Sequence, residues 1–154
     1  MTLTSWRIFK KKHKTTAFTG EGARLFGGRW NSRGVPVIYT SQTAALAVLE
    51  ILVHLHAPEI LDAYLLAPVT FDEALMEIVS RNQLPANWRK DPPPAALPRL
   101  GDRWVARGDF AVLRVPSALI DTEYNYLLNP AHPDFARCIF GKAKRFRIDP
   151  RLAK

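Results

Sequence analysis

One carboxylate, Glu50, lies in an unusually apolar stretch of the sequence. Between residues 44 and 55, Glu50 and His54 are the only polar side chains, and every other residue is Ala, Val, Leu or Ile. A helix this apolar on all sides is expected to be mostly buried, and a carboxylate within it must be paired, protonated or directed into a cavity. Glu50 therefore belongs either to a narrow solvent-facing stripe with His54, one helical turn further on, or to the wall of a functional site.

A glycine-rich stretch supplies the second candidate, Arg29, within the sequence Gly27-Gly28-Arg29-Trp30-Asn31. Glycine lets a ligand approach the backbone closely, and an arginine beside exposed backbone N–H donors suits a phosphate. The alternative is an ordinary loop whose tryptophan anchors the core. The spacing matches neither a P-loop nor a dinucleotide-binding fingerprint, so any nucleotide site here is not of the Rossmann type.

Ser117 is the third candidate, because it follows a predicted strand and a proline. A hydroxyl can be held at the end of a strand in this way, although a lone serine in such a place is most often a cap or turn residue. No Gly-x-Ser-x-Gly elbow surrounds it, so a hydrolase triad has no support. The four histidines lack the spacing of a metal site, and we expect no catalytic metal.

Length and hydrophobic pattern predict a single α+β domain over residues 1–154. Short strands are expected near residues 5–9, 37–40, 61–71, 112–115, 138–140 and 145–148. A mainly apolar helix is expected over residues 43–56, with Ser41 as its N-cap and Pro58 ending it. A second, short helix is expected over residues 99–107.

Two segments are predicted to be irregular. Residues 84–98 are rich in proline and are expected to form a surface loop or lid, and residues 125–133 look turn-rich. The longest apolar run is too short to cross a bilayer, and the N-terminus lacks the features of a signal peptide. The single cysteine, Cys138, cannot form an internal disulfide, which favours a cytoplasmic location.

The net charge of +8 favours an anionic partner. Much of the excess lies in two clusters, Lys10, Lys11, Lys12 and Lys14 near the start and Lys142, Lys144, Arg145, Arg147, Arg151 and Lys154 at the end. The charge suits an anionic dinucleotide, an acidic protein or nucleic acid, and two solvated basic faces would explain it equally well. A nucleic-acid-binding module without catalytic activity is thus an alternative, although no helix-turn-helix, RRM or zinc motif occurs.

Several short motifs follow one another over nearly the whole chain. They are Gly27-Gly28-Arg29-Trp30-Asn31-Ser32-x-Gly34-x-Pro36, Tyr39-Thr40-Ser41, Ala47-x-x-Glu50 with Val53-His54, Val115-Pro116-Ser117-Ala118, Glu123-x-Asn125-Tyr126-Leu127-Leu128-Asn129-Pro130, His132-Pro133 and Asp149-Pro150-Arg151-Leu152. This ordered set resembles the RES-domain family, which is named for an arginine, a glutamate and a serine. The proline-rich middle of the chain matches no motif.

The resemblance implies a fold like that of the ADP-ribosyltransferase toxins, with short strands around a central cleft. It also implies the toxin component of a type II toxin–antitoxin system, held inactive by an Xre-type DNA-binding antitoxin, so that contact with DNA is only indirect and no membrane is involved. The implied enzymatic activity degrades NAD⁺ by cleaving the nicotinamide–ribose bond, through hydrolysis, phosphorolysis or ADP-ribosyl transfer. NAD⁺ is then the substrate, and no cofactor is implied.

The resemblance assigns roles to six residues. The implied catalytic set is Glu50, Arg29 and Ser117. The implied NAD-binding set is Arg7, Tyr39 and Asn125. Cleavage of the bond builds positive charge on the ribose, which a carboxylate stabilises; the two arginines would bind the pyrophosphate and Tyr39 would border the nicotinamide. A toxin-like protein that has lost its activity is a further alternative, but the expected residue types occupy the arginine, tyrosine, glutamate and serine positions.

Overall fold

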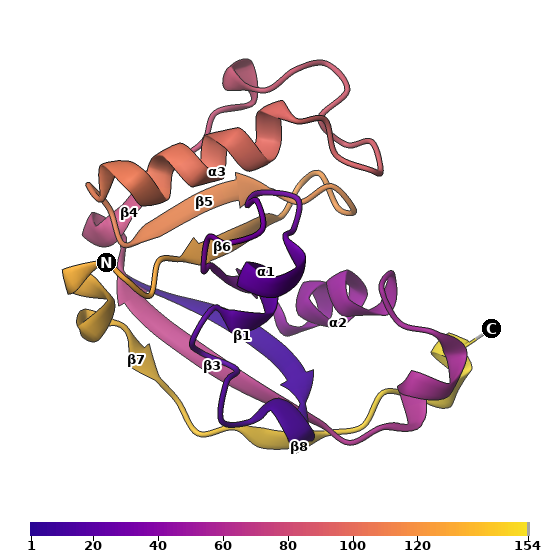
Figure 1. Cartoon of the computed structure of the whole chain (residues 1–154). Coiled ribbons are helices and arrows are strands. Elements are labelled where there is room, and N and C mark those ends of the chain that lie inside the picture. Colours follow the sequence, from indigo (N-terminus) through magenta and orange to yellow (C-terminus); the bar gives the residue numbers. More distant parts are fainter. Residues whose placement is uncertain (154) are drawn as a thin grey trace.

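Eight strands form one curved sheet in the computed structural model, which describes residues 1–153 (Figure 1). The strands are β1 (Thr2–Lys10), β2 (Ile38–Ser41), β3 (Tyr64–Asp72), β4 (Met76–Ile78), β5 (Val112–Pro116), β6 (Tyr124–Leu128), β7 (Ile139–Phe140) and β8 (Lys144–Phe146). Their order is β4-β5-β6-β2-β1-β3-β7, and β8 also pairs with β3. Only β4 and β5 are parallel; the other pairs are antiparallel.

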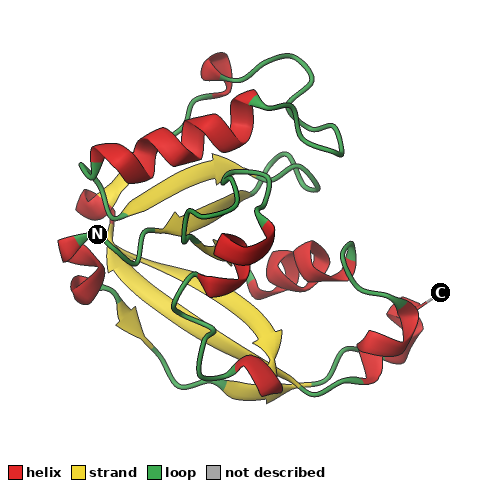
Figure 2. Ribbon diagram, in the orientation of Figure 1, coloured by secondary structure: helices red, strands yellow, loops and turns green. Residues whose placement is uncertain are grey.

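Three α-helices pack around this sheet (Figure 2). They are α1 (Glu21–Phe26), α2 (Ala44–Leu52) and α3 (Ala96–Arg107). The predicted α+β class is therefore confirmed. Within residues 1–153, no helix has the length and apolar character that crossing a membrane requires.

Two apolar clusters cover one face of the sheet. Trp104 of α3 packs with Leu127 of β6 in the first cluster, and Ile8 of β1 packs beneath α2 in the second. Because alternate residues of a strand share a face, Ser41 and its cross-strand partner Asn125 lie on this same face. Both are buried polar residues, 4% and 9% exposed. The sheet thus carries a polar strip between two apolar clusters.

The longest strands are the neighbours β1 and β3, which pair along nine consecutive positions, well beyond the short first strand predicted from the sequence. By contrast, β1 and β2 pair at one position, Trp6 with Ser41, and then diverge. Among residues 1–153, this single pair is the only backbone pairing between two halves of the sheet. One half contains β4, β5, β6 and β2, and the other contains β1, β3, β7 and β8.

The predicted apolar helix forms, but with different ends and a different environment. Thr43, not Ser41, is its N-cap, because Ser41 still belongs to β2 and the Thr43 side chain accepts a hydrogen bond from the Leu46 N–H. The helix ends at Leu52 rather than residue 56, since His56 is extended and caps a following short 3-10 helix. The expectation of a mostly buried helix was wrong, because Leu49 is 39% exposed and His54 lies in solvent.

Two other predictions are corrected by the structure. The segment predicted to be turn-rich from residue 125 onward begins as the central strand β6, which pairs with both β2 and β5. The helix predicted from residue 99 begins at Ala96, so that the end of the predicted loop 84–98 is helical. Pro98 fits there because the first turn of a helix tolerates proline, and the fully buried Leu97 belongs to the core.

Gly101 allows α3 to pack closely on the glycine-rich loop. A Cβ at this position would lie 1.7 Å from the Trp30 carbonyl oxygen. We expect Gly101→Ala to lower the free energy of unfolding by roughly 1–3 kcal/mol through overpacking, despite the better helix propensity of alanine. Urea denaturation measures the change. In the control Gly22→Ala, on α1, the new methyl group has no atom within 4 Å, so stability should hold or rise; equal stability of the two variants would contradict the packing argument.

Candidate active site

The side chain of Glu50 is half-buried on α2 and is held by two donors from other elements. Its Oε1 accepts a hydrogen bond of 2.8 Å from the Ser117 hydroxyl and another of 2.8 Å from the Asn125 amide nitrogen. Oε2 accepts no hydrogen bond from residues 1–153. One oxygen is therefore anchored, and the other has no hydrogen-bond partner among these residues.

Ser117 is fully buried at the end of β5. Its Oγ accepts hydrogen bonds from the N–H groups of Leu119 and Ile120, both at 3.1 Å. Since these two donors occupy the acceptor sites of the hydroxyl, its own hydrogen is directed to Glu50. Ser117 thus caps a turn and also donates a hydrogen bond to the carboxylate. The sequence left open whether it was a turn residue or a residue of the site, and it contacts both the turn and Glu50.

Ser41 is a further member of this group that the sequence analysis missed, having assigned it to a helix cap. Its hydroxyl donates to the Asn125 amide oxygen at 2.8 Å. This bond fixes the orientation of the amide, so that the NH₂ group of Asn125 faces Glu50. A prediction that β2 pairs with β6 would have placed Ser41 opposite Asn125. The sequence around residue 125 resembles a turn, however, and did not predict a strand.

Tyr39 lies two residues before Ser41 on the same face of β2, and its hydroxyl organises the glycine-rich loop. The hydroxyl donates to the Asn31 amide oxygen at 2.6 Å and accepts from the Trp30 N–H at 3.1 Å. Burial raises the pKa of Tyr39 well above its usual value, so the hydroxyl remains a donor. A Cβ at Gly28 would lie 2.6 Å from the Tyr39 hydroxyl, which explains why glycine is needed there.

Arg29 projects from this loop to the proline-rich segment. Its Nη1 donates to the carbonyl oxygens of Trp88 (3.0 Å) and Lys90 (2.8 Å). The same segment is tied on its other side, where Nε of Arg89 donates to the Ala118 carbonyl at 3.1 Å. Residues 88–90, which we call the strap, therefore connect the Arg29 loop to the segment that follows Ser117.

Arg7 occupies the opening where β1 and β2 diverge. Its Nη1 donates to the Tyr39 carbonyl at 2.9 Å and its Nε to the Ala17 carbonyl at 2.7 Å. Burial without a carboxylate partner lowers the pKa of Arg7 to about 10, which leaves the guanidinium charged at neutral pH. Alternation along β1 directs Arg7 away from the face that carries Ile8 and α2.

The structure brings three of the six predicted residues, Glu50, Ser117 and Asn125, into direct contact. The other three join through β2, since the Tyr39 carbonyl binds Arg7 and its hydroxyl binds the loop of Arg29. No hydrogen bond within residues 1–153 links either arginine to the Glu50 group. Two surface pockets, of about 600 and 390 Å³, are lined by other residues.

Known proteins match this chain over the whole region that contains the site. The RES domain model matches residues 4–149, a span that includes all six predicted site residues. Toxin Res of Yersinia enterocolitica is 36% identical over 148 residues, covering 96% of this chain and 97% of that protein. The Prs ADP-ribosylating toxin of a Sphingobium species is 35% identical over 159 residues, covering 100% and 99%. This chain belongs to the RES domain family.

Proposed function

We propose that this chain is a toxin enzyme that cleaves the nicotinamide–ribose bond of NAD⁺, with Glu50 as the catalytic carboxylate. The observation that carries the proposal is the arrangement of Glu50, in which donors anchor Oε1 and Oε2 is left open. The Sphingobium relative, named as an ADP-ribosylating toxin, supports the same class of chemistry. A purely nucleic-acid-binding role would give this carboxylate no function.

Cleavage of the nicotinamide–ribose bond is favoured by a negative charge beside the ribose. As the bond between the ribose C1′ and the nicotinamide nitrogen breaks, the electron pair leaves with nicotinamide, which departs neutral, and positive charge develops on the ribose. A carboxylate stabilises this charge more in the transition state than in the substrate. Because the leaving group is neutral, no general acid is needed. The acceptor of the ADP-ribosyl group is water, phosphate or a protein side chain.

The surrounding residues prepare Glu50 for that role. Ser117 and Asn125 hold the carboxylate in one orientation, and such pre-organisation saves the cost of ordering it during the reaction. Asn125 would lie next to the ribose, and the second hydrogen of its amide group can contact a ribose hydroxyl or the amide of nicotinamide. Ser117 is fully buried and its hydroxyl already makes three hydrogen bonds, so it would position Glu50 rather than contact the substrate. Tyr39 would border the nicotinamide ring.

Arg29 would bind the pyrophosphate. The guanidinium of Arg29 already donates to two carbonyl oxygens of the strap, so substrate binding exchanges neutral acceptors for charged ones, which form stronger hydrogen bonds. Binding would thus release the strap from Arg29. Arg7, which the resemblance assigns to NAD binding as well, is held by the Tyr39 and Ala17 carbonyls and directed to the other face of the sheet, so it would contribute its charge rather than a direct contact.

We further propose that residues 1–154 act as one catalytic domain with a fold like that of the ADP-ribosyltransferase toxins, in the cytoplasm. An Xre-type antitoxin would hold the toxin inactive, and any link to DNA would pass through that antitoxin. Co-expression with the antitoxin should preserve cellular NAD⁺, whereas expression of the toxin alone should deplete it and stop growth.

Replacement of Glu50 by glutamine tests the central claim. Glu50→Gln keeps the size of the side chain but removes its charge, so we expect nicotinamide release to fall by about 100-fold or more. Mass spectrometry of a reaction with NAD⁺ measures it, with and without phosphate to identify the acceptor. The control is Glu77→Gln, a carboxylate bound to Arg107 by two hydrogen bonds of 2.8 Å away from the site. Undiminished release by Glu50→Gln would refute the role of this residue.

Arg29 offers a separate test of the phosphate site. Arg29→Ala should raise the KM for NAD⁺ by about 10-fold or more, the value of one to two hydrogen bonds to a charged group, with a smaller effect on kcat. Arg33→Ala is the matched control, because Arg33 is an exposed arginine of the same loop without a hydrogen bond to residues 1–153. If both variants show the wild-type KM, Arg29 does not bind the pyrophosphate.

A further inference from the structure

Basic residues from the beginning and from the end of the sequence meet at one end of the sheet. Lys11 follows β1, and its N–H donates to the Ala63 carbonyl just before β3. On the other side of β3, β8 pairs Arg145 with Leu65 and Lys144 with Leu66. Figure 1 shows β8 running beside β3 at the end of the molecule away from α3. Lys11 from the first basic cluster therefore shares one surface with Lys144 and Arg145 from the second.

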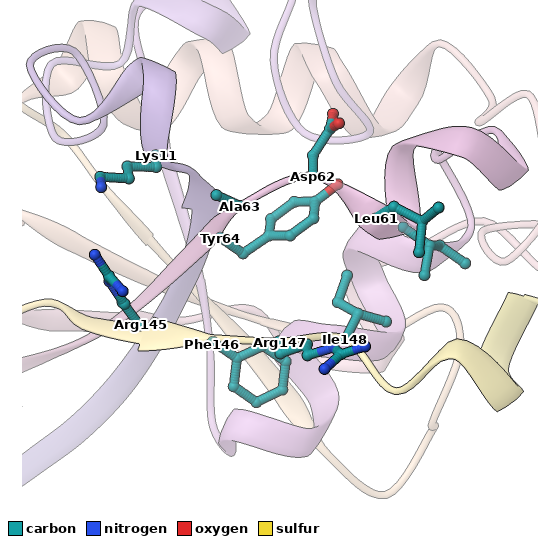
Figure 3. A pocket seen from close by; sticks show the side chains of 10 residues that line it. Lys11, Leu61, Asp62, Ala63, Tyr64, Arg145, Phe146, Arg147 and Ile148 are labelled. Atoms are coloured by element: carbon teal, nitrogen blue, oxygen red, sulfur yellow. The ribbon is translucent and has the colours of Figure 1, made fainter.

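Two pockets open on this surface. The first, of about 600 Å³, contains Tyr64, with Lys11 and Arg145 to one side of its ring and Leu61 to the other (Figure 3). The residues that line it are Lys11, Ile60, Leu61, Asp62, Ala63, Tyr64, Arg145, Phe146, Arg147 and Ile148.

The second pocket, of about 390 Å³, combines the apolar side chains of Trp6, Leu66 and Pro68 with Lys142, Lys144 and Arg145. Arg145 lines both pockets. We call the two pockets together the basic groove.

The cations that line the basic groove form no ion pair among residues 1–153. Asp62 is the only carboxylate of those residues that lines the groove, and its Oδ2 lies 3.2 Å from Nζ of Lys10, which also binds Glu59. These contacts raise the pKa of Lys10 and lower that of Glu59, as expected for a satisfied ion pair. The lining cations have no carboxylate within 4.0 Å among residues 1–153; they are Lys11, Lys142, Lys144, Arg145 and Arg147.

We propose that the basic groove binds an acidic, partly apolar peptide segment of a partner protein. Its cations are exposed and distributed along two adjoining pockets, which suits an extended chain with several carboxylates better than one compact anion. Apolar side chains line both pockets and can receive apolar residues of the segment. Glu50 does not line the groove, so the proposal is independent of the NAD⁺ chemistry.

Neither nucleic-acid binding nor the protection of an edge strand accounts for the basic groove as well. Single-stranded nucleic acid binds best where its bases stack on exposed aromatic rings, but Tyr64 is only 1% exposed, and Trp6 and Phe146 are partly buried and pack against the core beneath α2. Basic residues also protect edge strands against aggregation, which would account for Lys144 and Arg145 on β8. It does not account for Lys11 and Arg147, which lie outside the strands.

Fluorescence anisotropy tests the proposal with three labelled probes: a short peptide of alternating Glu and Leu, the same peptide with Gln in place of Glu, and a single-stranded DNA of equal charge. The first probe should bind the purified chain, and added salt should weaken its binding. Arg145→Glu should weaken it by about tenfold or more, because the substitution reverses the charge shared by both pockets. Arg103→Glu, an equal change of charge on an exposed position of α3, should leave binding unchanged.

The outcomes separate an acidic peptide from the alternative ligands. Equal binding of the Gln peptide, or equal loss of binding in both variants, would show that no acidic segment is recognised at the groove. Tighter binding of the DNA, lost in Arg145→Glu, would assign the groove to nucleic acid instead. Lys11→Ala with Arg147→Ala provides a second variant should Arg145→Glu fail to fold. Glu50→Gln should bind the peptide like the wild type, and Arg145→Glu should retain the enzymatic activity.

Discussion

The anchoring of Glu50 by Ser117 and Asn125 is the interaction on which the proposed site depends. A carboxylate on an apolar helix is costly unless donors meet it, and here the donors come from the end of β5 and from β6. Each donor is itself held by another group, so the arrangement extends to Ser41 on β2 and to the turn after Ser117. Loss of one member would leave buried polar groups of the others without partners.

The four-residue strand β2 connects the parts of the site. Its Ser41 side chain reaches the Glu50 group through Asn125, the Tyr39 hydroxyl holds the glycine-rich loop, and the Tyr39 carbonyl receives Arg7. Because β2 pairs with β6 along its whole length, the contacts of Ser41 and of the Tyr39 hydroxyl share one sheet frame, whereas the contact with Arg7 crosses to β1, which pairs with β2 at one position only. The strap is different, since side chains and not a sheet hold it, and it is the part that substrate binding can displace.

Residue types and motif order were enough to single out Glu50, Ser117 and Asn125, which the structure places in contact. The apolar run around Glu50 predicted a carboxylate that is paired, protonated or directed into a cavity, and its two donors fit the first of these. The run did not predict the environment of the helix: Leu49 is partly exposed, because α2 packs with one side only. Ser41 looked like a helix cap, and its actual partner became visible only once β6 was known to be a strand. The asparagine and proline residues around β6 resemble those of turns, and pairing with both neighbours overrides that local preference.

The single backbone pair between β1 and β2 has a mechanical consequence. The sheet behaves as two smaller sheets joined at Trp6 and Ser41, and beyond that joint a guanidinium replaces the missing ladder of hydrogen bonds. A side chain with several rotatable bonds resists separation less than a paired strand does. The two halves of the sheet are therefore most easily separated along this line, which lies immediately beside Tyr39 and Ser41 of β2.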